Sequence, residues 1–74
     1  MDTNSQLFIF KTDIAELCPN CEVYKLLNRH EGVQQWNIDT DDVDRVLRIE
    51  SATLSALEII SIINSLGHEC QELN

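Results

Sequence analysis

Two cysteines, Cys18 and Cys21, form a Cys-x-x-Cys motif and are the residues best suited to chemistry in this chain. The motif lies between an apolar run, residues 7–10, and a helical pattern that begins near Val23. A loop that leads into a helix exposes its side chains, and a helix N-terminus favours the thiolate that binds metals or attacks disulfides. The motif therefore points to soft-metal binding or to thiol chemistry.

The elements around the motif follow from the spacing of apolar residues. Residues 7–11 alternate little and predict a central strand that is flanked on both edges. A helical repeat follows, with side chains at i, i+3, i+4 and i+7: Val23, Leu26, Leu27 and His30. We expect Pro19 in the first turn of this helix, Cys18 directly before it, and Gly32 at its end.

The second half of the chain predicts a hairpin and a short last strand. Residues 33–39 and 45–50 each place apolar side chains on one side, and the Asp-rich residues 40–44 join them. A calcium loop needs a glycine at its sharp turn, which this stretch lacks, so a solvated turn is predicted. The last strand is expected over residues 68–73.

Residues 51–66 predict a second helix between the hairpin and the last strand. Either Thr53 or a capping box of Ser55 with Glu58 is expected at its start, and Gly67 at its end.

The second helix carries more apolar side chains than one sheet face needs. We expect the surplus, Leu57 and Ile60, to contact the first helix. The alternative is an exposed apolar patch that binds a second copy or a partner.

The order β-α-β-β-α-β is the ferredoxin-like arrangement, an α+β fold with a four-stranded antiparallel sheet and two helices on one face. The chain resembles a heavy-metal-associated (HMA) domain, the module of copper chaperones and of the N-terminal regions of metal-transporting ATPases. These residues carry the resemblance: Val23, Leu26, Leu27, Gly32-Val33, residues 36–39, Ile59, Ile63, Leu66-Gly67 and residues 68–70. Residues 10–14 and 36–50 look especially like small stand-alone bacterial members. One such domain is expected over residues 1–74.

The metal motif is displaced from its usual place in that family. HMA domains usually carry Met-x-Cys-x-x-Cys, and counting back from the helix puts Ile14 at the Met and Glu16 and Pro19 at the two cysteines. Cys18 and Cys21 each lie two residues later. A loop two residues longer, with a helix half a turn shorter, would return both cysteines to the usual place relative to the helix start.

The candidate metal ligands are Cys18, Cys21 and His68. Soft thiolates select Cu(I) or Zn over hard cations, and two thiolates suffice for linear Cu(I). Structural zinc normally has four ligands. His68 lies in the turn before the last strand, which in this fold comes near the cysteine loop, so it is either a third ligand or an exposed turn histidine. Cys70 is expected to be a buried packing residue.

The resemblance implies a protein without catalytic activity that binds Cu(I) or Zn for metal transfer or buffering. A metal-transporting ATPase or another metalloprotein would be its partner. One alternative is an HMA-like interaction or regulatory module that has lost the metal. Another is a thiol–disulfide redox protein, because Cys18-Pro19-x-Cys21 followed by Lys25 to Leu27 also resembles the active-site segment of a glutaredoxin. A thioredoxin-like fold needs a cis-proline beside the active site, yet Pro19 is the only proline.

Composition limits the partners. Thirteen acidic and five basic residues give a formal charge of -8, which disfavours nucleic acid and anionic membrane surfaces. No apolar run approaches the roughly 20 residues of a membrane span. We therefore expect a cytoplasmic protein with reduced cysteines, as a monomer or weak homodimer.

Overall fold

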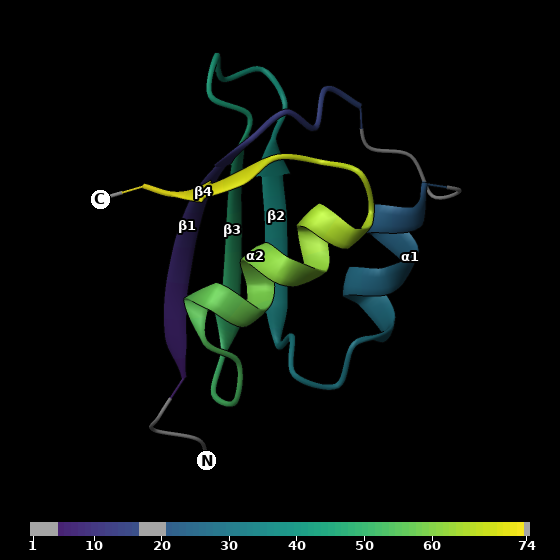
Figure 1. The fold of residues 1–74 in the computed structure, drawn as a ribbon. Helices are drawn as coiled ribbons and strands as arrows, with labels where there is room; N and C mark the ends of the chain where they lie inside the picture. The colour runs from purple at the N-terminus through teal and green to yellow at the C-terminus, as the bar shows by residue number, and fades with distance from the viewer. Residues whose placement is uncertain (1–4, 17–20, 74) are drawn as a thin grey trace.

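The computed structural model describes residues 5–16 and 21–73, and it has the predicted order β-α-β-β-α-β. The elements are β1 (Gln6–Thr12), α1 (Glu22–Arg29), β2 (Gln35–Asp39), β3 (Val46–Ser51), α2 (Ala56–Ser65) and β4 (Cys70–Glu72). The strands form one sheet in the order β2-β3-β1-β4, and all neighbouring pairs are antiparallel (Figure 1). The α+β ferredoxin-like prediction is confirmed, including the central place of β1.

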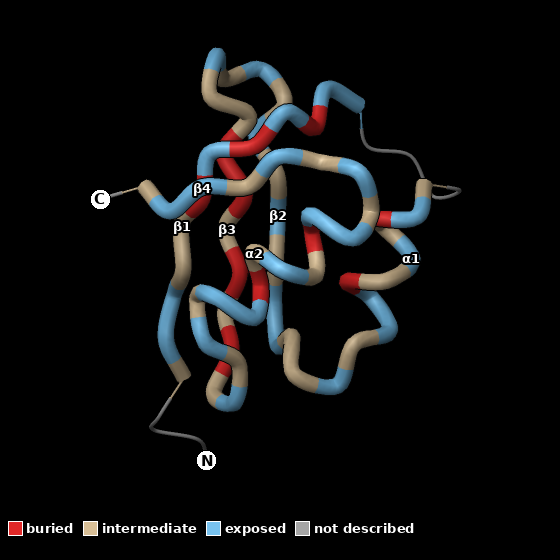
Figure 2. Tube along the Cα trace, viewed as in Figure 1, coloured by how far each residue is buried: buried red, intermediate tan, exposed pale blue. Residues whose placement is uncertain are grey.

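The core lies between the sheet and the two helices. Phe10, Leu47 and Ile49 are fully buried, and the strand register places them on the same face of β1 and β3. The buried residues of both helices join them in one cluster: Val23 and Leu27 from α1, Ile59 and Ile63 from α2. Both helices therefore cover one face of the sheet, and Figure 2 shows buried positions on β1, on β3 and on each helix.

Helix α1 begins later than the sequence predicts. Its first residue is Glu22 and its N-cap is Cys21, whereas Pro19 was expected in the first turn; Cys18 and Pro19 lie outside the described residues. The helix ends at Arg29, and the His30 N–H donates to the Leu26 carbonyl. Helix α1 is therefore shorter at its N-terminus than the sequence pattern predicts.

The expectation that Gly32 ends α1 is wrong. The C-cap is His30, in an extended conformation, and among the described residues positive φ angles occur elsewhere, at Arg45 and Gly67. The Gly32 N–H instead donates to Nδ1 of His30 at 3.0 Å. Gly32 is required for space, because an added Cβ would lie 2.9 Å from Leu54 Cγ.

Helix α2 begins at Ala56 with a capping box. Ser55 Oγ accepts the Glu58 backbone N–H at 3.2 Å, and Glu58 Oε1 accepts the Ser55 N–H at 2.9 Å. The expected start at Ser51 is too early, because Ser51 ends β3 and its Oγ accepts the N–H groups of Thr53 and Leu54. Of the two predicted caps, the structure selects Ser55.

The end of α2 sets the turn into β4. Gly67 has a φ of +89°, and its N–H donates to the Asn64 carbonyl while the His68 N–H donates to the Ile63 carbonyl. These two bonds are the Schellman pattern of a helix that ends at glycine, as predicted. Strand β4 then begins at Cys70, two residues later than expected.

The surplus apolar residues of α2 separate into two environments. Ile60 packs partly against the core, whereas Leu57 is 78% exposed, so the expected contact of Leu57 with the first helix is wrong. Within the described ranges, neither helix combines the length and the apolar character needed to cross a bilayer.

Candidate functional site

Cys21 occupies the N-cap of α1. Its backbone is extended, with φ -73° and ψ 143°, and its side chain makes no capping hydrogen bond. The first backbone N–H groups of the helix have no partner within the helix, and the positive end of the helix dipole lies beside the sulfur. This position stabilises a thiolate. The other cysteine of the motif, Cys18, lies outside the described residues.

The structure holds Cys21 in a disulfide bond, so it represents an oxidised form of the chain. The sequence expectation was of reduced cysteines. Metal coordination needs thiolates, and a site at Cys21 therefore requires prior reduction.

Cys21 and His68 line the same surface hollow. It lies between the connection from β1 to α1, the start of α1 and the turn after α2, and these side chains line it: Asp13, Glu16, Cys21, Glu22, Leu66 and His68. His68 and Cys21 thus line the same hollow, and the rest of the cysteine loop lies outside the described residues. Residues far apart in sequence meet here because β1 and β4 are neighbouring strands whose ends reach the same side of the sheet.

The lining of this hollow is negatively charged. It includes the carboxylates of Asp13, Glu16 and Glu22, and no Lys or Arg belongs to its described lining. Such a surface attracts cations and repels anions. Within residues 5–16 and 21–73, no three His, Cys, Asp or Glu side chains are grouped closely enough to hold a metal ion.

Asp13 is a residue of the hollow that the sequence did not mark as functional. Its Oδ1 lies 3.1 Å from His68 Nδ1 and accepts the Glu69 N–H, also at 3.1 Å. Desolvation raises the pKa of Asp13. The hydrogen bond from Glu69, and then the hydrogen bond and charge of His68, lower the pKa by more than desolvation raises it. The pKa of Asp13 therefore lies below its ordinary value. No local pattern links residues so distant in sequence; only the fold does.

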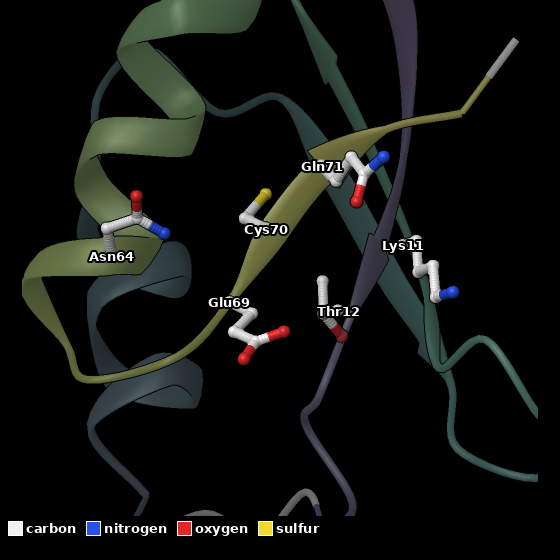
Figure 3. A pocket seen from close by; sticks show the side chains of 6 residues that line it. All are labelled: Lys11, Thr12, Asn64, Glu69, Cys70 and Gln71. Atoms are coloured by element: carbon white, nitrogen blue, oxygen red, sulfur yellow. The ribbon is translucent and has the colours of Figure 1, made fainter.

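Cys70 does not line the hollow. It packs against the core as predicted, but it is partly buried and not fully buried as expected. It is a free thiol, half-buried at the edge of the core, and desolvation raises its pKa to about 11. It lines a pocket of about 300 Å³ formed by the end of β1, α2 and β4, together with Thr12, Asn64 and Glu69 (Figure 3). Figure 3 also shows Lys11 extending away from Cys70. A protonated, half-buried thiol is a poor ligand and nucleophile, so we assign no site there.

Comparison of the chain with protein-family models, with curated proteins and with solved structures finds no match. The ferredoxin-like fold carries many unrelated functions, so the fold alone assigns none. The function is therefore argued from the hollow and its residues.

Proposed function

We propose that the reduced chain is an HMA-like protein that binds a soft metal ion, Cu(I) or Zn(II), through Cys18 and Cys21. His68 is the third ligand, and the bound ion is held for transfer or buffering without catalysis. One observation carries the proposal: Cys21, at a helix N-cap, and His68, at the far end of the chain, line the same hollow. Sulfur and imidazole nitrogen are the ligands that these ions prefer.

The negative charge around the hollow supports the proposal that it binds a metal cation. The carboxylates around the hollow favour a cation, and the formal charge of the whole chain is -8. A strongly acidic surface steers association with a basic partner more than it adds affinity. We propose that the partner is a metal-transporting ATPase or another metalloprotein that presents a basic face.

The test is an anaerobic titration of the reduced chain with Cu(I) and with Zn(II) against a competing chelator. We expect one ion per chain, with NMR shifts confined to residues 13–23 and 66–70. Cys18→Ala and Cys21→Ala should each abolish tight binding while the fold persists. Cys70→Ala is the matched control, since it removes a thiol outside the hollow and should leave the affinity unchanged.

Failure of the wild-type chain to compete with the chelator would overturn metal binding. The alternative of an interaction module would then be tested at α2, where Leu57 is 78% exposed. Loss of binding in Cys70→Ala alone would also contradict the proposed ligands.

Thiol–disulfide exchange is the second candidate, because Cys21 is disulfide-bonded at a helix N-terminus. Stabilisation of the thiolate there favours the reduced form and makes a disulfide more oxidising. Equilibration with glutathione measures this. A potential above about -230 mV would support exchange, whereas structural disulfides fall below about -300 mV.

A further inference from the structure

The carboxylate of Asp13 connects two segments that both line the hollow. Its Oδ1 accepts the Glu69 N–H and contacts His68 Nδ1, both at 3.1 Å. We infer that Asp13 is a positioning residue, which holds the His68 ring with its proton on Nδ1 so that Nε2 coordinates the metal ion. This inference rests on the proposed metal-binding function and names the atom that His68 contributes.

The tautomer follows from the hydrogen-bond partner. An ionised carboxylate can only accept, so the nitrogen that faces Asp13 Oδ1 must be the donor. In a neutral imidazole the other nitrogen then keeps its lone pair. For His68 that nitrogen is Nε2, and the ring lines the hollow that Cys21 also lines.

Hydrogen bonds also hold the backbone of His68. Its N–H donates to the Ile63 carbonyl at 3.3 Å, and its carbonyl accepts Nδ2 of Asn64 at 2.9 Å. Gly67, with its φ of +89°, sets the direction of the chain just before it. With the backbone and Nδ1 both held, the ring has little freedom before any ion arrives, although the side chain remains 34% exposed.

This arrangement is what a histidine metal ligand requires. Metal-bound histidines almost always donate the other ring N–H to a carboxylate, a carbonyl or water, which fixes the ring and makes it a stronger ligand. Asp13 could instead have only a structural role, connecting the end of β1 to the turn before β4. That role would need the hydrogen bond from the Glu69 N–H but no particular tautomer of His68. The tautomer and the metal affinity therefore separate the two roles.

The experiment uses the full reduced chain and Zn(II) alone as the probe. Before metal is added, long-range ¹⁵N NMR of the His68 ring should show the proton on Nδ1 in the wild type. In Asp13→Ala the proton should move towards Nε2. Zn(II) affinity should fall about 10- to 100-fold in Asp13→Ala.

Two further variants serve as controls. Asp13→Asn keeps an acceptor oxygen, so it should restore part of the affinity. It also keeps the test possible if Asp13→Ala does not fold. Glu31→Ala removes one exposed carboxylate outside the hollow lining and should change neither quantity.

A double variant shows whether Asp13 acts through His68. We expect Asp13→Ala to weaken Zn(II) binding in the wild-type background but not further in a His68→Ala background. The inference would be overturned if Asp13→Ala weakened Zn(II) binding equally in both backgrounds, or if the His68 proton lay on Nε2 in the wild type. In either case, tight Zn(II) binding by the wild type would still uphold the proposed function. A wild-type chain that binds no Zn(II) overturns both, and the wild-type titration identifies that case.

Discussion

Gly32 lies directly against Leu54: a Cβ added at residue 32 would come within 2.9 Å of Leu54 Cγ and 3.0 Å of Thr53 Oγ1. Gly32 belongs to the connection between α1 and β2, and Leu54 precedes α2, so this contact joins the two connections on one side of the molecule. The branch carbon of Leu54 cannot move aside without displacing the rest of the side chain, which packs against the core.

Gly32→Ala should lower the free energy of unfolding by about 1 to 3 kcal/mol, because the added methyl group forces Leu54 from its place. Urea unfolding of the reduced chain measures the change. Leu54→Ala in the same chain should remove part of the penalty, since the clash disappears with the larger side chain. Strictly additive effects of the two substitutions would contradict the contact.

Gly67→Ala should also destabilise, by about 1 kcal/mol, but for a conformational reason. Gly67 has a φ of +89° and nothing lies within 4 Å of an added Cβ. Asn tolerates left-handed conformations better than Ala, so Gly67→Asn should cost less than Gly67→Ala. At Gly32, where space is limiting, the larger Asn should cost more than Ala. The same order of Ala and Asn at both glycines would refute this distinction.

Ser55→Ala should cost about 1 kcal/mol of stability, because it removes the side-chain half of the capping box with Glu58. Thermal unfolding gives the value. Thr53→Ala is the matched control: Thr53 also loses a hydroxyl but caps no helix, so its change should stay within about 0.5 kcal/mol. A larger loss at Thr53 than at Ser55 would mean that the helix begins earlier than the structure places it.

The parts of the fold that could be predicted are those with local signals. Phe10, Leu47 and Ile49 stand in short apolar strands, and Ser55 with Glu58 is a capping box that can be read directly from the sequence. Each of these patterns extends over only a few residues, so the element it predicts could be identified without knowing the tertiary contacts. The element order, and with it the ferredoxin-like arrangement, followed from such signals.

The errors arose where a distant contact or a competing hydrogen bond decides. Ser51 looks like the start of a helix, but it pairs with Gln6 in the sheet and its hydroxyl binds two nearby N–H groups. Gly32 looks like a helix end, but its role depends on Leu54. The fold predicted that His68 would lie on the side of the cysteine loop, and His68 lines the same hollow as Cys21. Its bond to Asp13 was not predicted, because no local pattern marks that carboxylate.

Acid should weaken the tie between Asp13 and the turn before β4. The pKa of Asp13 is lower in the folded chain than in the unfolded chain, where it is near 4. Such a carboxyl stabilises the fold at pH values above its unfolded pKa. That contribution is lost as the pH falls through the pKa of the folded state. The stability difference between wild type and Asp13→Ala should therefore be larger at about pH 6 than at about pH 2. Unfolding by urea at the two pH values measures it. A difference that grows on acidification would contradict the sign of the shift.

Cys70 should react slowly with alkylating reagents. Desolvation raises its pKa from 9.0 to about 11, so at about pH 8 the folded chain holds about 100-fold less Cys70 thiolate than an ordinary thiol would. A thiolate of higher pKa is more nucleophilic, which offsets about half of that factor on a logarithmic scale and leaves a rate about tenfold below that of an exposed thiol.

Iodoacetamide labelling of the folded chain without reductant, followed by peptide mass spectrometry, gives the rate at Cys70. Ser61→Cys supplies an exposed thiol in the same chain as the internal reference. Unfolding in urea should bring the two rates together, because burial is the cause of the difference. Equal rates in the folded chain would show that Cys70 is accessible and ionises normally, and its assignment to packing alone would then be wrong.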